Sequence, residues 1–182
     1  MAGILKVDQY QDFNGNTIMT SDGAGNLTLN NAALKATPAF EANLSSEQSA
    51  SNDTYTKMDF DEEVFDTDGA FDHTTNQRFT VPSGKAGKYH IYSNVVLGGS
   101  ANDSLIDAKH LIYKNGSVYS RTIYHSGNNK QRYVQMSVAS TMDLAVGDYV
   151  EIYAQVNLST GSVEFRAQNR EATFGGFRII GA

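Results

Sequence analysis

The chain has 182 residues, which fits one ordinary domain with a short appendage, and a domain of about 150 residues needs no covalent staple to fold. Its formal net charge of −6 and pI near 5.1 argue against nucleic-acid binding, which requires a basic stripe that displaces counterions from phosphates. Cysteine is absent, which excludes disulfides, thiolate metal sites and cysteine nucleophiles.

The first ten residues alternate polar and apolar side chains, and they lack the apolar stretch of roughly 7–15 residues that a signal peptide needs. No window approaches the ~18 apolar residues of a membrane span. We therefore expect a soluble chain that is made in the cytoplasm and does not insert into a membrane.

Residues 1–36 differ from the rest of the chain. Two short apolar runs, Ile4–Val7 and Leu27–Leu29, surround turn-rich stretches at 14–16 and 22–26. Such a segment cannot bury a core of its own, because an isolated hairpin is marginal in water. It must lie on a partner or intertwine with copies of itself. We interpret residues 1–36 as an N-terminal anchor or trimerisation segment, followed by a head at 37–182.

The head opens with short predicted strands. Pro38–Ala42 and Tyr55–Phe60 have strand character, and the Ser-, Asn- and Glu-rich stretch 42–56 between them predicts an exposed loop. A further short strand is predicted at Arg78–Val81. Lys88–Leu97 is a long strand with apolar residues on both faces, which indicates cover on both sides by a second sheet or by a neighbouring subunit.

A hairpin is predicted in the middle of the head. Asn115 and Gly116 tolerate the positive φ that both central residues of a type I′ turn require, and strands are expected on either side at Ile106–Lys114 and Val118–Tyr124. Gln131–Ala139 then alternates polar and apolar residues, which predicts the next strand.

The last part of the chain continues the strand pattern. Tyr149–Leu158 alternates with period two, with apolar residues on one face and polar residues on the other, as in a half-buried strand. Shorter strands are predicted at Ser162–Arg166 and Phe174–Ile180. About ten short strands separated by turns are typical of an all-β sandwich or jelly roll.

Six short motifs follow one another in the order that the C1q-like family uses. They are Pro38-Ala39-Phe40-Glu41-Ala42, Phe71-Asp72 with Arg78-Phe79-Thr80-Val81-Pro82, Gly87-Lys88-Tyr89-His90-Ile91, Lys114-Asn115-Gly116, Leu144 with Gly147-Asp148-Tyr149-Val150, and Phe174-Gly175-Gly176-Phe177. The head therefore resembles a C1q-like domain of the complement C1q/TNF superfamily. The resemblance implies a C1q/TNF-like jelly-roll sandwich of about ten antiparallel strands that works as a homotrimer.

The N-terminal segment departs from the animal members of that family, because no collagen-like Gly-x-y repeat is present. Instead, Gly3-Ile4-Leu5-Lys6-Val7-Asp8, with Asn14-Gly15 and Gly25-Asn26-Leu27-Thr28, resembles the short N-terminal segment of many structural proteins of tailed bacteriophages. This resemblance implies a virion appendage, assembled in the host cytoplasm, in which the segment binds other virion proteins and carries a trimeric knob.

The sequence offers no catalytic constellation and no cofactor site. His73, His90, His110 and His125 form no His-x-His or His-x-x-x-His pair, and cysteine is absent. The motif residues named above are explained by core and turn packing. We therefore predict that the protein is not an enzyme.

Carboxylates concentrate between Asp59 and Asp72. An EF-hand loop would place Val64 at the first ligand position, so that motif fails. The family resemblance nevertheless implies calcium as a candidate ligand near the trimer apex, with Asp66, Asp68 and Asp72 as candidate ligands. The alternative is a solvated acidic loop.

Two polar loops between long strands are the candidate recognition surface, because exposed loops on a rigid scaffold commonly carry binding residues. The candidate receptor contacts are Asn102, Asp103, His125, Asn128, Asn129 and Lys130. The alternative is that these loops are plain connectors.

Together these features favour a homotrimeric fibre or appendage protein of a tailed bacteriophage, whose head binds a host-surface receptor or glycan. The alternative is a bacterial C1q-like adhesin or lectin module that binds glycans or proteins. A depolymerase is a third hypothesis, which the lack of tryptophan and of an aromatic cleft disfavours.

Overall fold

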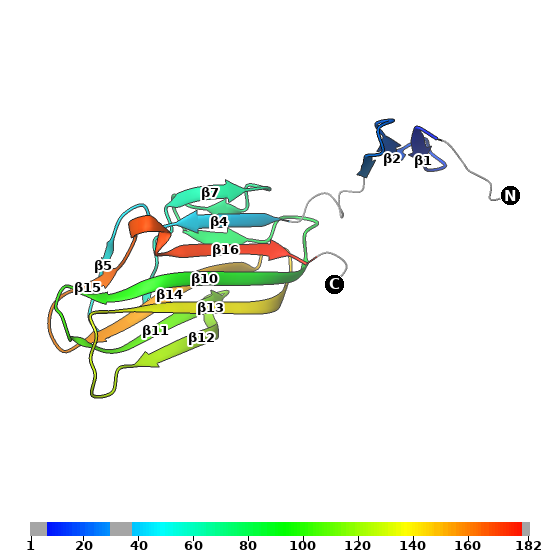
Figure 1. Cartoon of the computed structure of the whole chain (residues 1–182). Coiled ribbons are helices and arrows are strands. Elements are labelled where there is room, and N and C mark those ends of the chain that lie inside the picture. Colours follow the sequence, from blue (N-terminus) through cyan, green and yellow to red (C-terminus); the bar gives the residue numbers. More distant parts are fainter. Residues whose placement is uncertain (1–6, 30–37, 180–182) are drawn as a thin grey trace. The chain divides into compact units, whose positions relative to one another are not determined.

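The computed structural model describes residues 7–29 and 38–179. The chain divides into two compact units, Met1–Thr37 and Pro38–Ala182 (Figure 1). The predicted division between residues 36 and 37 lies outside the described residues, as does most of the apolar run Ile4–Val7. In the described parts of the chain, no helix has the length and hydropathy needed to cross a membrane.

The N-terminal unit contains a small antiparallel sheet in the order β1-β2-β3. Its strands are β1 (Gln9–Gln11), β2 (Thr17–Ser21) and β3 (Leu27–Leu29). None of residues 7–29 is buried within this unit.

Both turns of the small sheet are closed by the same Asp-x-x-x-Asn arrangement. Asp12 Oδ1 accepts hydrogen bonds from the backbone N–H groups of Asn14 and Asn16, and Asp12 Oδ2 accepts one from the Asn16 side-chain amide at 2.8 Å. Asp22 makes the equivalent three bonds to Ala24 and Asn26. Local hydrogen bonds of this Asx type therefore hold the turns without help from a core.

The head is a sandwich of two antiparallel sheets (Figure 1). The first sheet has the order β5-β15-β10-β16-β4-β7, and β13 pairs with β10 on its other side. Its strands are β4 (Ala39–Asn43), β5 (Gln48–Ala50), β7 (Glu62–Asp66), β10 (Gly87–Gly99), β13 (Tyr133–Leu144), β15 (Val163–Phe165) and β16 (Thr173–Arg178).

The second sheet has the order β12-β11-β14-β9-β8, and β6 also pairs with β14. Its strands are β6 (Thr56–Lys57), β8 (Phe71–Asp72), β9 (Arg78–Thr80), β11 (Leu105–Lys114), β12 (Ser117–His125) and β14 (Tyr149–Leu158). The single 3₁₀ turn of the described chain is η1 (Gln168–Arg170). The prediction of an all-β jelly-roll sandwich is therefore confirmed.

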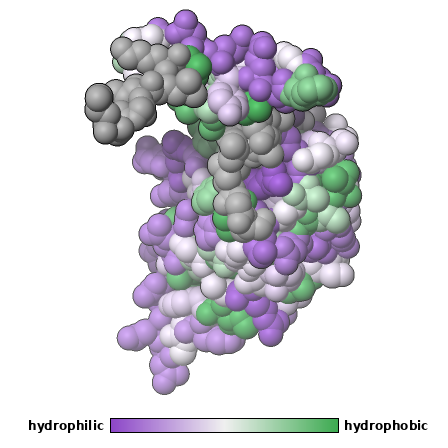
Figure 2. Space-filling model, turned by 90° about the vertical axis from the view of Figure 1, so that its right-hand side faces the viewer, coloured by the Kyte–Doolittle hydropathy of each residue, from purple (hydrophilic) through white to green (hydrophobic). Residues whose placement is uncertain are grey.

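The core contains the aromatic residues of the sequence motifs. Phe40 stacks on Phe71 and Phe79, with ring centroids 5.1 and 4.7 Å apart, and meets Phe174 edge-on at 5.0 Å. These arrangements are the ones that aromatic rings prefer. On the face seen in Figure 2, hydrophobic side chains form small separate patches among hydrophilic ones, as expected when the apolar strand faces lie inside the sandwich.

The hairpin and the alternating strand are formed as predicted. Asn115 and Gly116 have φ values of 50° and 77° between β11 and β12. The apolar face of β14 is buried, but Glu151 and Gln155 on its polar face are also buried. The reason is that Lys57 Nζ lies 2.6 Å from Glu151 Oε1, and Gln155 is covered by the loop over residues 51–55.

Three sequence expectations need correction. The strand predicted over Tyr55–Phe60 is limited to β6 at Thr56–Lys57. The stretch 42–56 is not one exposed loop, because Leu44 is buried and β5 pairs with β15. Gln48–Ala50 lacks alternating apolar residues, so its pairing depends on backbone hydrogen bonds that leave no pattern in the sequence. The last strand ends at Arg178 and not at Ile180.

Strand β10 runs along the sandwich and defines its two ends (Figure 1). At its start, Ile179 N–H donates to Lys88 O, and Arg178 N–H donates to Pro38 O, so the head begins and ends there. We call this the Pro38 end. Thirteen residues of extended chain span about 40 Å, and they bring Gly99 to the opposite end of the sandwich.

Candidate recognition surface at the loop end of the head

The two polar loops singled out by the sequence lie beside each other at the far end of β10. Leu105 N–H donates to Gln131 O at 2.9 Å, which joins the base of loop 100–104 to the base of loop 126–132. A third loop, over residues 159–162, is bonded to loop 100–104. Ser159 N–H donates to Ser104 O at 2.8 Å, and Ser100 N–H donates to Ser162 O at 3.0 Å.

A fourth loop, over residues 51–55, was not predicted as part of this surface. The Asn52 side chain both donates to Leu158 O at 3.0 Å and accepts from Leu158 N–H at 2.8 Å. Asp53 accepts from the Gln155 amide at 2.6 Å. We refer to these four loops together as the loop end. The sequence signal was weak, because Asn52 and Asp53 lie in a stretch that is polar throughout.

The predicted receptor contacts lie in two loops of the loop end, except for His125, which is the last residue of β12 and precedes loop 126–132. The exposed ones are Asn102, Asp103, His125, Asn128 and Asn129, whereas Lys130 is half-buried. Asp103 has φ of 50°, a left-handed conformation that Asp tolerates in tight turns. The structure therefore places these residues on or beside two loops whose bases are hydrogen-bonded to each other.

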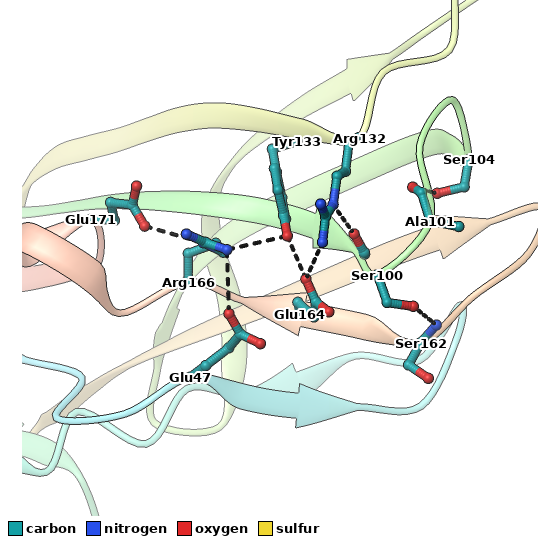
Figure 3. A network of polar contacts seen from close by, with 11 residues as sticks. Glu47, Ser100, Ala101, Ser104, Arg132, Tyr133, Ser162, Glu164, Arg166 and Glu171 are labelled. Atoms are coloured by element: carbon teal, nitrogen blue, oxygen red, sulfur yellow. Dashed lines mark hydrogen bonds and ion pairs between the residues drawn. The ribbon is translucent and has the colours of Figure 1, made fainter.

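A polar network supports the loop end from the side of the first sheet (Figure 3). At its centre, the Tyr133 hydroxyl donates to Glu164 Oε2 at 2.5 Å and accepts from Arg166 Nη1 at 3.2 Å. The guanidinium carbons of Arg132 and Arg166 lie 4.8 and 4.9 Å from the centroid of the Tyr133 ring. Partial burial and the hydrogen bond to Glu164 raise the pKa of Tyr133.

The same network connects strands that are distant in sequence. Arg166 lies 3.6 Å from Glu47 and 3.3 Å from Glu171, and Arg132 Nε donates to Gly99 O at 3.0 Å. Charge-assisted bonds of this kind fix geometry where several share one donor or acceptor. The network therefore holds the bases of loops 100–104 and 126–132 in a fixed position.

The four histidines have four separate surroundings. His73 lies 3.4 Å from Glu63, His90 faces outward beside Thr141, and His125 is exposed at the loop end. His110 is fully buried in the sandwich, with Nε2 3.0 Å from Ser93 Oγ. They are not brought together into a common site.

The calcium candidates are close in sequence but make separate interactions. Asp66 accepts hydrogen bonds from the N–H groups of Asp68 and Phe71, the latter at 2.6 Å. Asp68 forms an ion pair with Lys85 at 3.5 Å.

Asp72 closes a third Asp-x-x-x-Asn turn. Its carboxylate accepts from the N–H groups of Thr74, Thr75 and Asn76 and from the Asn76 side-chain amide, and these bonds lower its pKa. Protein donors thus already occupy these oxygens, and within residues 7–29 and 38–179 no three acidic or histidine side chains converge on one point. Calcium binding stays a prediction that this geometry does not favour.

Comparison with solved structures places the fold. Murine APRIL superposes with a TM-score of 0.57 at 13% identity, covering 79% of this chain and all of that one. The globular domain of the zebrafish complement 1qA protein gives 0.54 at 18% identity, covering 78% of this chain and 97% of that one. The head has a C1q/TNF-like fold. No known family model and no curated protein matches the chain by sequence.

The C1q/TNF-like fold accounts for the positions of the motif residues. Phe40, Phe79 and Phe174, from the first, second and last motifs, meet in the core. A Cβ added at Gly175 would lie 2.4 Å from Tyr92 Oη, so this glycine is required where β16 passes under the tyrosine. These motif residues therefore serve the scaffold.

Proposed function

We propose that the protein is a virion structural protein of a tailed bacteriophage, a homotrimeric fibre or appendage whose C1q-like head binds the host surface through its loop end. It is a binding protein and not an enzyme. The single observation that carries this proposal is the position of the loop end, at the opposite end of β10 from Pro38, where the N-terminal unit connects. A support at one end and exposed polar loops at the other is the arrangement of an attachment protein.

The N-terminal sequence supports assignment to a virion. Its opening Gly3-Ile4-Leu5-Lys6-Val7-Asp8 resembles segments of phage structural proteins, and we propose that residues 1–36 bind other virion proteins. Mass spectrometry of purified virions from a phage that encodes the chain is the direct test. Binding to cells by a protein that is absent from virions would instead favour a bacterial C1q-like adhesin or lectin.

The outer face of the first sheet supports the homotrimer. Phe177 is 44% exposed, and its ring centroid lies 5.4 Å from that of His90, which in turn lies 6.4 Å from that of Tyr92. Val96 lies on the same outward face of β10, beyond the polar residue Asn94. A sheet face that presents aromatic and aliphatic side chains is suited to burial against another subunit.

Attachment is tested by substituting Asn128, Asn129 and Lys130 together by alanine. We expect an almost unchanged melting temperature, because surface substitutions usually change stability by less than about 0.5 kcal/mol, and weaker attachment of particles to host cells. The matched control replaces three polar residues near the Pro38 end, Ser83, Lys88 and Asp143. Equal attachment by both variants would count against this loop, and glycan cleavage by the wild type would count against the whole proposal.

A further inference from the structure

The small N-terminal sheet carries one row of large apolar side chains. Tyr10 lies directly opposite Met19, and Met19 lies directly opposite Leu29. Residues that are directly opposite on paired strands project to the same face of a sheet. Tyr10, Met19 and Leu29 therefore form a continuous row across all three strands, which we call the apolar row.

The other face of the same sheet carries a polar row, and Ile18, next to Met19 on β2, is an apolar residue outside the apolar row that is 41% exposed. Gln9, Thr20 and Thr28 form the neighbouring row of opposite residues. The Gln9 side-chain amide donates to Thr17 Oγ1 at 2.5 Å, and the Gln11 amide donates to Gln9 Oε1 at 3.0 Å. The two faces of the sheet therefore differ, although a single three-stranded sheet encloses no core.

Among residues 7–29 the apolar row is only partly covered. Tyr10 is 48% exposed, and Leu27, which continues the same face opposite Ser21, is 59% exposed. Met19 and Leu29 are half-buried. A small sheet of this kind becomes stable when its hydrophobic face is packed against another layer.

The length of the connection to the head indicates which partner can reach the apolar row. Nine peptide units separate Leu29 from Pro38, and this length spans at most about 30 Å. In a homotrimer of heads, three identical apolar rows are therefore confined near one another. Short linkers of this kind give effective concentrations in the mM range, which favours association of the copies even when each contact is small.

We propose that the apolar rows of three copies pack against one another, and that the Gln- and Thr-rich faces point outward to the virion partner. The proposal rests on the proposed homotrimer and assigns the two faces of the N-terminal sheet to different partners. The turn carboxylates of Asp12 and Asp22 fit this assignment, because they are at the ends of the strands and are engaged in their own turns.

The absence of cysteine from the chain allows a direct test, because any introduced thiol is unique. In the full-length protein, M19C places the thiol in the apolar row, and T20C places it one residue further along β2 on the opposite face. Under mild oxidation we expect covalent dimers of M19C in at least tenfold higher yield than those of T20C. The pair L29C and T28C repeats the comparison on β3, so that a folding defect at one position does not decide the result.

Sedimentation of each variant in reducing buffer separates the two proposals. A monomeric protein would reject the homotrimer and with it the packed rows. A trimeric protein in which both row positions cross-link no faster than their polar-face controls would reject the packed rows alone. Preferential cross-linking of Met19→Cys and Leu29→Cys in a trimeric protein supports both.

Discussion

His110 is a buried polar residue inside an apolar sandwich. The Ser93 hydroxyl donates to Thr173 O at 2.8 Å, so Ser93 Oγ accepts the proton of His110 Nε2. Nδ1 of His110 is buried without a protein partner among the described residues. Burial lowers the pKa of His110 to about 3, and the ring is therefore neutral in the folded protein at neutral pH.

This burial predicts a pH dependence of stability. An unfolded histidine binds a proton below about pH 6.5, whereas folded His110 remains neutral down to about pH 3. The unfolded state thus binds more protons in this window, and the free energy of unfolding falls by up to about 1.4 kcal/mol for each pH unit of acidification. Urea denaturation at pH 7 and pH 4.5 should show a smaller acid loss for His110→Gln than for wild type. The same substitution at exposed His125 should retain the wild-type loss; equal losses in all three proteins would contradict the assignment.

Asp148 connects two turns at the Pro38 end of the head. It accepts hydrogen bonds from the Asn115 amide at 2.8 Å, from Lys114 Nζ at 2.9 Å and from Ala145 N–H at 2.9 Å. These bonds lower the pKa of Asp148 to about 2. Their contribution to stability is present above the unfolded pKa near 3.9 and is lost as the pH falls through the folded value.

We expect Asp148→Ala to lower the free energy of unfolding by about 1–3 kcal/mol at pH 7, because three donors lose their acceptor. Chemical denaturation measures this change. Asp143→Ala is the control, since the Asp143 side chain is 82% exposed and its ion pair with Lys88 is long, at 3.9 Å. A loss in Asp148→Ala no greater than in the control would show that the turn connection contributes nothing.

At the scale of elements, strands with side-chain patterns were predictable and strands formed by backbone pairing alone were not. The hairpin around Asn115-Gly116 and the alternation of β14 are local signals, and both were found. Strand β5 has no such signal, because Gln48–Ala50 pairs with β15 through backbone groups. Glu151 and Gln155 appeared solvent-facing because their partners, Lys57 and Asp53, are about a hundred residues away in sequence.

In the candidate site, too, the features with a local sequence signal were predictable and the long-range contacts were not. Loops 100–104 and 126–132 were recognised separately as polar connectors between long strands. Their adjacency depends on the Leu105–Gln131 bridge, which no local pattern encodes. The network around Tyr133 was missed for the same reason, since Glu164 and Arg166 come from β15 and its end and read as ordinary exposed positions.

The close contact between β16 and Tyr92 predicts the effect of a substitution at Gly175. A Cβ at Gly175 would lie 2.4 Å from Tyr92 Oη and 3.0 Å from Phe40 O, so Gly175→Ala must displace the tyrosine or separate β16 from β4. We expect a loss of about 1–3 kcal/mol, typical of overpacking, measured as a lower melting temperature. The loss should shrink when Tyr92→Ala is already present. An undiminished loss in that background would place the strain elsewhere.

For the whole molecule, the division into two units predicts that the head is independent. The buried core residues of the sandwich all come from residues 38–179, so a protein of residues 37–182 should fold and form a trimer without the N-terminal unit. Light scattering measures its mass, and a stable monomer at micromolar concentration would refute the prediction.

In particles, deletion of residues 1–36 should abolish incorporation, whereas normal incorporation would show that the segment is not the anchor.

The direction of β10 has a mechanical consequence. Strands β10 and β13 of the first sheet run between the Pro38 end and the loop end, and β4 and β16 run alongside the half of β10 that is nearer Pro38. Tension between an anchor at Pro38 and a ligand held at the loop end would therefore act along the strands, in shear. Shear strains many hydrogen bonds of the β10–β13 and β10–β16 ladders at once, whereas a force across the strands would open them one by one like a zipper. The orientation of this sheet suits a domain that must remain folded while it is pulled.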